Sequence, residues 1–146
     1  MPRKVTNLII VHCSATPASH THVDAKEIDG WHRKKGWLKI GYHYVITRDA
    51  VVQKGREQEE IGAHAAGFNH ESLGVCLVGG TAEDGKTPEN NFNSQQMYAL
   101  HALLLRLRQD YPHARIVGHG ELDPKKACPS FSVKYWLTDK PELAVE

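Results

Sequence analysis

The sequence contains little cysteine, and the cysteines that it has are irregularly spaced. Its 146 residues include three, Cys13, Cys76 and Cys128, an odd number without the spacing of a disulfide framework. This excludes a disulfide-stabilised secreted scaffold and indicates either a reduced compartment or a metal-binding role. A chain of this length can bury a core without cross-links, so we predict a single domain over residues 1–146.

The sequence also lacks an excess of charge of either sign. Its 18 basic and 17 acidic side chains leave a formal net charge of +1, which excludes the broad basic surface of a general nucleic-acid binder. One basic cluster is formed by Arg33, Lys34, Lys35 and Lys39. We interpret it as the end of a helix, where cations suit the helix dipole, and attraction to an anionic surface is the alternative.

No long hydrophobic run is present. The apolar stretch Leu8–Val11 is far shorter than the roughly 18 residues of a membrane span. His12 follows it directly, and a histidine does not suit the core of a signal peptide. We therefore expect a soluble protein that is made in the cytoplasm, has no membrane contact and needs another factor for any export.

Strand-like segments that alternate with helical ones predict an α/β fold. Leu8–Val11 is a continuous apolar run, as is typical of a strand buried on both faces. Further strands are predicted over residues 73–78 and 115–117, and a hairpin over residues 42–47 and 51–54. The hairpin adds an antiparallel pair, so we predict a single domain with a central mixed β-sheet flanked by helices.

The predicted helices are marked by their capping residues. Asp24, with Glu27 three residues later, predicts a helix over residues 25–35. Asn93 and Gln96 open the longest helix in the same way, and its apolar residues recur at helical spacing to form one buried face. A short helix is expected over residues 133–137. In the hairpin, Ala50 stands where glycine is usual, and a positive φ would be costly there, so we expect a different turn type.

Two histidines and one cysteine are singled out by their position. His12 closes the strand 8–11, His119 follows the strand 115–117, and Cys128 lies in an irregular loop. Sites in α/β sheets lie beyond the carboxyl ends of strands, and a buried imidazole needs a partner. Two imidazoles and one thiolate suit a zinc ion with an open fourth position, which implies catalysis. An inert or redox-active cysteine is the alternative.

Two other site types can be excluded from the sequence. Cys13 should point to the opposite face from His12, and Cys76 lies within a core strand, so neither completes a closed structural zinc site. His119-Gly120-Glu121 matches the H-x-E opening of the zinc deaminases. That class also requires P-C-x-x-C, whereas this chain has Cys128-Pro129 in the reverse order and no second cysteine three residues later.

Five blocks of sequence, in order from about residue 8 to residue 136, carry a family resemblance. They are Val11–Thr16 (VHCSAT), Gly41–Ile46 (GYHYVI), Gly62–Ala65 (GAHA), Asn69–Gly80 (NHESLGVCLVGG) and Ala127–Phe131 (ACPSF). Together they resemble the zinc-dependent N-acetylmuramoyl-L-alanine amidases, and within them the amidase-type lysozymes of tailed phages, which are relatives of the peptidoglycan recognition proteins. The resemblance implies a mixed sheet flanked by helices and a groove for the glycan–peptide junction of peptidoglycan.

The resemblance also implies a role for individual residues. The zinc ligands fall on His12, His119 and Cys128, and the catalytic residues fall on Tyr42 and Lys126. The expected reaction is attack of a water on the amide between the lactyl group of N-acetylmuramic acid and L-alanine. Zinc, Lys126 and Tyr42 would stabilise the negative charge on the carbonyl oxygen.

Some assignments within the resemblance stay open. His64 and Asn69 fall on the groove wall and are candidates for substrate contact, with a hydrogen bond that fixes the loop as the alternative. Proton delivery to the leaving amine is assigned to Tyr42, with Glu121 as the alternative. The segment before Cys128 is one residue longer than in phage relatives and contains both Lys125 and Lys126. Lys126 keeps the spacing to Cys128, so we assign it the catalytic role.

The predicted function is that of a monomeric phage or prophage endolysin that acts in host lysis. Three alternatives remain from the sequence. The first is a peptidoglycan-binding module without hydrolysis, although such modules usually lack the cysteine or the tyrosine that this chain keeps. The second is a regulator, since some phage relatives also bind and inhibit a phage RNA polymerase. The third is a cytoplasmic amidase that recycles muropeptides.

Overall fold

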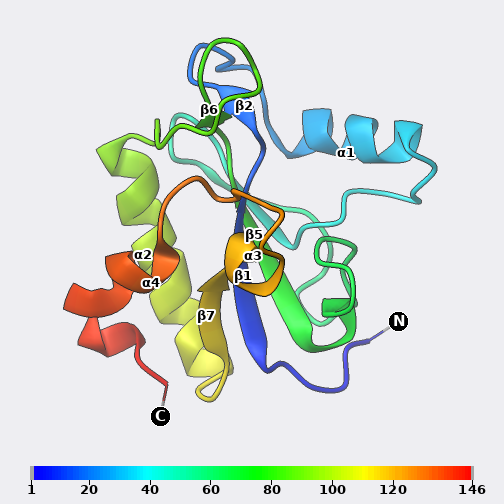
Figure 1. Cartoon of the computed structure of the whole chain (residues 1–146). Helices are drawn as coiled ribbons and strands as arrows, with labels where there is room; N and C mark the ends of the chain where they lie inside the picture. Colours follow the sequence, from blue (N-terminus) through cyan, green and yellow to red (C-terminus); the bar gives the residue numbers. More distant parts are fainter. Residues whose placement is uncertain (1, 146) are drawn as a thin grey trace.

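A five-stranded mixed sheet forms the centre of the computed structural model, which describes residues 2–145 (Figure 1). The strand order is β4-β3-β5-β1-β7. Strand β1 pairs in parallel with β5 on one side and β7 on the other, whereas the hairpin strands β3 and β4 are antiparallel. The predicted mixed sheet is confirmed. The strands are β1 (Leu8–Cys13), β3 (Tyr44–Ile46), β4 (Val52–Lys54), β5 (Ser72–Leu77) and β7 (Arg115–Gly118).

Helices cover both faces of this sheet. All residues of β1 and β5 are buried, as their continuous apolar sequences predict. Ile9 and Val11 pack in the cluster formed with α2 (Ser94–Asp110) and α4 (Val133–Trp136). Leu8 and Ile10 point to the opposite face, where α1 (Ala25–Lys34) lies farther along the sheet (Figure 1). His12 shares the face of Leu8 and Ile10 because side chains alternate along a strand.

The predicted caps define where the two long helices begin. The Asp24 carboxylate accepts a hydrogen bond from the Glu27 amide at the start of α1. Asn93 and Gln96 form a reciprocal capping box at the start of α2. The leucines on one face of α2 are at most 4% exposed, and burying each contributes about 1.5–3 kcal/mol. They are Leu100, Leu103, Leu104 and Leu107.

The turn between β3 and β4 differs from expectation. Ala50 has a φ of 66°, so the expectation that it would avoid a positive φ was wrong. The loop has three residues, and the last residue of such a loop takes the left-handed conformation before the strand resumes. Hydrogen bonds hold this conformation: the Ala50 amide donates to the Thr47 carbonyl at 2.9 Å, and the Thr47 amide donates to the Val51 carbonyl at 3.0 Å.

Several short elements were not predicted from the sequence. They are the two-stranded sheet of β2 (Thr16–Pro17) and β6 (Gly80–Thr81), the helix α3 (His119–Leu122), and the 3-10 helices η1 (Asn69–Glu71), η2 (Leu137–Asp139) and η3 (Pro141–Leu143). Segments of two to four residues are too short to show a periodic pattern. Within residues 2–145, no helix has both the length and the apolar character needed to cross a bilayer.

Candidate active site

The register of the parallel strands brings His12 and His119 together. Val11 on β1 pairs with Gly118 on β7. The residues that follow them, His12 and His119, therefore lie at the same edge of the sheet. The two imidazole rings have centroids 4.5 Å apart. His12 is 1% exposed within β1, and His119 is half-buried as the first residue of α3.

Backbone contacts bring Cys128 to the same place. The Gly120 amide on α3 donates to the Cys128 carbonyl at 2.8 Å. A Cβ atom at Gly120 would lie 2.6 Å from the Lys126 carbonyl oxygen, so only glycine lets the cysteine loop lie against α3. The backbone amide of Cys13 then donates to the Cys128 sulfur at 3.1 Å. Cys128 is thus attached to both of the elements that carry the histidines.

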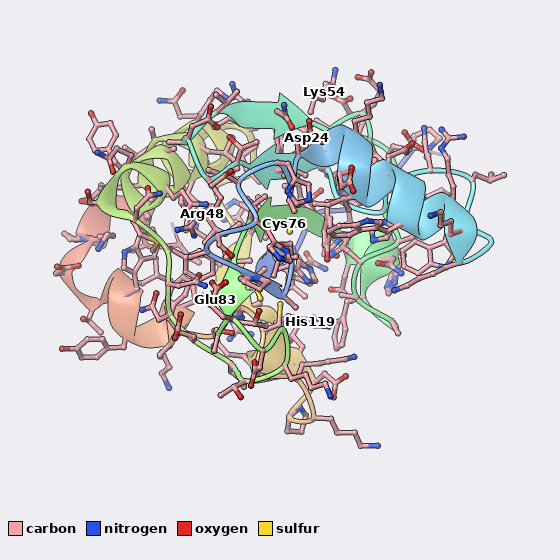
Figure 2. All side chains as sticks on the ribbon, turned by 90° about the horizontal axis from the view of Figure 1, so that it is seen from above. Asp24, Arg48, Lys54, Cys76, Glu83 and His119 are labelled. Atoms are coloured by element: carbon pink, nitrogen blue, oxygen red, sulfur yellow. The ribbon has the colours of Figure 1, made fainter. Side chains whose placement is uncertain are left out.

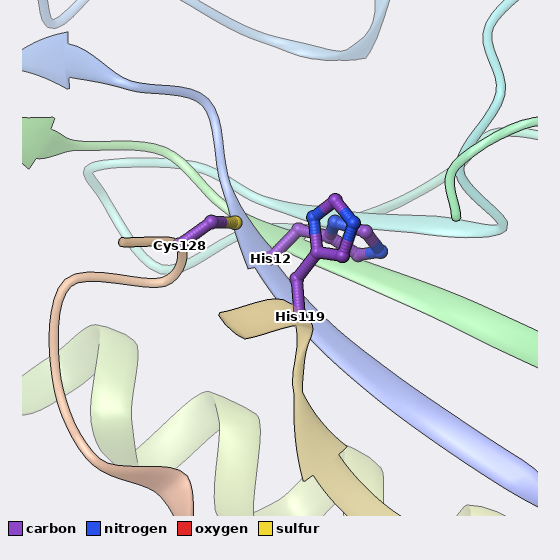
Figure 3. Close-up of side chains that lie close together, drawn as sticks. All are labelled: His12, His119 and Cys128. Atoms are coloured by element: carbon purple, nitrogen blue, oxygen red, sulfur yellow. The ribbon is translucent and has the colours of Figure 1, made fainter. Parts of the chain in front are cut away.

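His12, His119 and Cys128 form a cluster with the donor set of a metal site (Figure 3). One ligand atom from each lies within 4.8 Å of the other two. Zinc binds imidazole nitrogen at about 2.0–2.1 Å and thiolate sulfur at about 2.3 Å, so one ion fits between the three atoms. No other such cluster occurs among residues 2–145. Three protein ligands leave a fourth position for water or substrate.

The environment of both histidines keeps their rings neutral, which is the form that binds a metal. Burial lowers the pKa of His12 well below its ordinary value, and the neighbouring His64 and His119 lower it further. Burial also lowers the pKa of His119, with a second contribution from the Lys126 ammonium group. Neither ring therefore has to lose a proton at neutral pH before it can act as a ligand.

The two other cysteines differ in their distance from the cluster. Cys76 is fully buried in β5, near the centre of the molecule in Figure 2, as its position in a core strand predicts. Cys13 was predicted to point to the opposite face from His12, and it is not part of the cluster; its backbone amide contacts the Cys128 sulfur. The neighbouring Cys13 side chain and burial raise the pKa of the Cys128 thiol. A cation is therefore needed to stabilise its thiolate.

Tyr42 lies against the cluster from the side of β5. Its ring centroid is 5.0 Å from that of His12. Burial raises the pKa of the Tyr42 hydroxyl well above its ordinary value, and the neighbouring thiols of Cys76, Cys128 and Cys13 raise it further. The hydroxyl consequently keeps its proton at neutral pH and can act as a hydrogen-bond donor.

The structure distinguishes between the two adjacent lysines. Among the described residues, Lys126 lines the groove beside His119, and Lys125 does not. The ammonium group of Lys126 is also close enough to lower the pKa of His119. The Glu121 carboxylate instead accepts a hydrogen bond from the Gly118 amide at 2.7 Å and borders a different hollow, next to Arg115 and Lys134. Glu121 therefore faces away from the groove.

The groove itself has a volume of about 400 Å³, and His119 is one of the residues that line it. His64 and Asn69 both lie in its wall, as predicted. Their hydrogen bonds, however, are made within the protein. The Asn69 side-chain oxygen accepts from the amides of His64 and Ala65, both at 2.9 Å, which is the loop-fixing role that the sequence left open. His64 forms a hydrogen bond with His12.

Other residues of the groove were not predicted. Trp37 and Phe68 contribute aromatic surface to its wall, and Trp37 is 39% exposed. Trp37 follows Gly36, the glycine with a positive φ just beyond α1, and an aromatic residue after a helix stop is the only signal that the sequence offers. Ser72, which contacts His64, is a polar residue in an otherwise apolar buried strand. That pattern could have identified it.

A mixed α/β sheet with a cluster of two histidines and a cysteine, one of which lines a groove, defines a candidate metal-dependent hydrolase. The family model of the N-acetylmuramoyl-L-alanine amidases matches residues 2–131. The chain therefore belongs to the N-acetylmuramoyl-L-alanine amidase family.

Individual relatives agree with this assignment. The endolysin of Enterobacteria phage K11 is 48% identical over 92% of this chain and 87% of its own length. The solved structure of the endolysin amidase LysCS from Clostridium intestinale URNW has a TM-score of 0.80 at 26% identity, covering 95% of this chain and 85% of that chain. A peptidoglycan-recognition protein of Drosophila melanogaster is 28% identical over 97% of this chain and 81% of its own length. The predicted family, its amidase activity and the resemblance to phage endolysins are confirmed.

Proposed function

We propose that this protein is a zinc-dependent endolysin that hydrolyses the amide bond between N-acetylmuramic acid and L-alanine in peptidoglycan. His12, His119 and Cys128 are the zinc ligands. The observation that carries the proposal is that these three side chains place their donor atoms within 4.8 Å of one another, and that one of them, His119, lines the groove. Bound zinc would polarise the scissile carbonyl and increase the acidity of a water molecule.

Lys126 and Tyr42 stabilise the charge that develops during the reaction. When water adds to the amide carbonyl, its oxygen becomes negatively charged. The Lys126 ammonium group lies beside His119 at the groove, and the Tyr42 hydroxyl keeps its proton next to His12. Donors that are already in place for an oxyanion each contribute about 100- to 1000-fold to the rate.

Tyr42 also delivers the proton that the leaving amine of L-alanine requires. The alternative donor, Glu121, has its carboxylate bound to the Gly118 amide and faces another hollow. The Tyr42 hydroxyl is protonated at neutral pH and would relay to the amine the proton that the attacking water gives up, so that Tyr42 is protonated again after each turnover. The amine therefore departs as a neutral group rather than as an amide anion.

The groove positions the glycan–peptide junction of the substrate. Trp37 and Phe68 would offer aromatic surface to sugar and peptide, and Lys126, which lines the same groove, would face the scissile bond. The protein acts as a monomer with one domain over residues 1–146. It is made in the cytoplasm and reaches the wall with the help of another factor.

The test compares two substrates and two metal states. The zinc-loaded protein should clear a suspension of intact peptidoglycan, a chelated sample should not, and added zinc should restore clearing. Activity confined to small soluble muropeptides would indicate the recycling enzyme instead. Co-purification with a phage RNA polymerase would identify the regulatory role that the family resemblance implies.

A further inference from the structure

The hydrogen bond between His64 and His12 fixes which nitrogen of His12 is available to a metal. Nε2 of His12 lies 2.8 Å from Nδ1 of His64, and the two rings meet edge to face with centroids 4.9 Å apart. Since Nε2 is engaged, the nitrogen that His12 can offer to the cluster is Nδ1. A neutral imidazole has one protonated nitrogen and one acceptor nitrogen, so Nδ1 can bind a metal only when Nε2 carries the hydrogen.

His64 is held so that it can accept that hydrogen. Its other nitrogen, Nε2, lies 3.2 Å from the hydroxyl of Ser72, a fully buried residue at the start of β5. When His64 Nε2 carries a hydrogen and donates to Ser72, Nδ1 of His64 is the acceptor that His12 needs. If the two hydrogen bonds ran in the opposite direction, His12 would carry its hydrogen on Nδ1 and could not bind a metal.

Contacts with the surrounding backbone fix the position of the His64 ring. A Cβ atom at Gly74 would lie 2.6 Å from Cγ and 2.7 Å from Nδ1 of His64. The ring therefore rests directly on the backbone of β5, beside β1. Asn69 fixes the other end of the residue, because its side-chain oxygen accepts from the amides of both His64 and Ala65.

We infer that His64 is a positioning residue that, together with Ser72, sets the tautomer of His12 for zinc binding, rather than a residue whose main role is substrate contact. The inference rests on the proposed zinc site and deepens it. Partners of this kind orient metal-bound histidines, and their removal typically weakens metal binding by about 10- to 100-fold.

The experiment measures zinc affinity by competition with a chromophoric chelator. His64→Phe, which keeps a ring but has no acceptor, should raise the zinc dissociation constant by about 10- to 100-fold. His64→Asn, whose side-chain oxygen can replace Nδ1, should recover most of that loss and keep a KM close to the parent value at saturating zinc. His70→Phe, at an exposed position in the nearby η1, is the matched control and should bind zinc like the parent.

A second measurement needs no variant and so does not depend on a variant that folds. Proton–nitrogen correlation spectra of the metal-free parent should show the hydrogen of His12 on Nε2, and a hydrogen on Nδ1 would overturn the inference. Equal zinc affinity of the parent and His64→Phe, with a raised KM, would also overturn it in favour of substrate contact. A parent that binds no zinc would instead overturn the proposed function itself.

Discussion

At the scale of single residues, the site depends on three side chains that no local pattern connects. His12, His119 and Cys128 come from a strand, a helix start and a loop, and they meet because β1 and β7 are parallel neighbours. The sequence could identify the two histidines by their position at strand ends. It could not show that Cys13 contacts Cys128 or that His64 contacts His12, since both contacts depend on how distant segments pack.

Cys128→Ala tests the metal site most directly among single substitutions. The change removes the only thiolate ligand, so the variant should lose bound zinc during dialysis and its activity should fall to the level of the chelated parent. Metal analysis after dialysis and clearing of peptidoglycan measure the two effects. Cys76→Ala is the control: it removes a buried thiol from β5, costs about 1 kcal/mol of stability and should retain zinc. A Cys128→Ala protein with parental activity would refute the ligand assignment.

The two adjacent lysines provide a second residue-scale prediction. Lys126→Ala should retain zinc and lose about 100- to 1000-fold in kcat, because it removes a donor to the developing oxyanion. Lys125→Ala should stay close to the parent, since Lys126 lines the groove and Lys125 does not. Steady-state kinetics on a soluble muropeptide measure both. If Lys125→Ala were the slower variant, the catalytic role would belong to Lys125.

At the scale of elements, the sequence predicted the long strands and helices, whose apolar patterns and caps are regular, and missed the short ones. β1 and β5 were evident as continuous apolar runs, and α1 and α2 from their caps. The helix α3 has four residues and begins at a functional histidine, and the β2–β6 sheet has two residues in each strand. The β2–β6 pair joins distant segments, and α3 is a single turn closed by the bond from the Asp123 amide to the His119 carbonyl; neither is long enough to show a periodic pattern.

The turn between β3 and β4 provides a prediction about stability at this scale. Ala50 has a φ of 66°, which costs an L-residue roughly 1–2 kcal/mol and costs glycine little. Ala50→Gly should therefore stabilise the protein by about 0.5–1 kcal/mol, after allowance for the greater freedom of glycine in the unfolded chain. Chemical denaturation measures the change.

Ala102→Gly is the matched control for the hairpin prediction. Ala102 is exposed in the middle of α2, where the same substitution should destabilise by about 1 kcal/mol. The two variants should thus shift the free energy of unfolding in opposite directions. A loss of stability in both would show that Ala50 is not strained.

At the scale of the whole molecule, buried histidines make the fold sensitive to acid. His43 is fully buried, its Nδ1 accepts from the Gly74 amide at 3.0 Å, and burial lowers its pKa to about 4. The unfolded chain binds a proton at the ordinary pKa of about 6.5. The stabilising contribution is therefore complete above pH of about 6.5 and is lost as the pH falls towards about 4, for a total of about 3 kcal/mol.

Unfolding of the metal-free protein in urea between these pH values measures this loss. The free energy of unfolding of His43→Gln should fall less steeply with decreasing pH than that of the parent, because one proton-binding group is removed. His70→Gln, at an exposed position, should follow the parent. Identical slopes for the parent and His43→Gln would show that His43 does not contribute.

The most direct test of the central claim is mass spectrometry of purified peptidoglycan digested with the zinc-loaded protein, beside a chelated sample. The fold, the groove and the His12–His119–Cys128 cluster predict new peptides with a free L-alanine amine, released only when zinc is present. Intact peptidoglycan in both samples, or cleavage at another bond, would contradict the claim that this protein is a zinc-dependent N-acetylmuramoyl-L-alanine amidase.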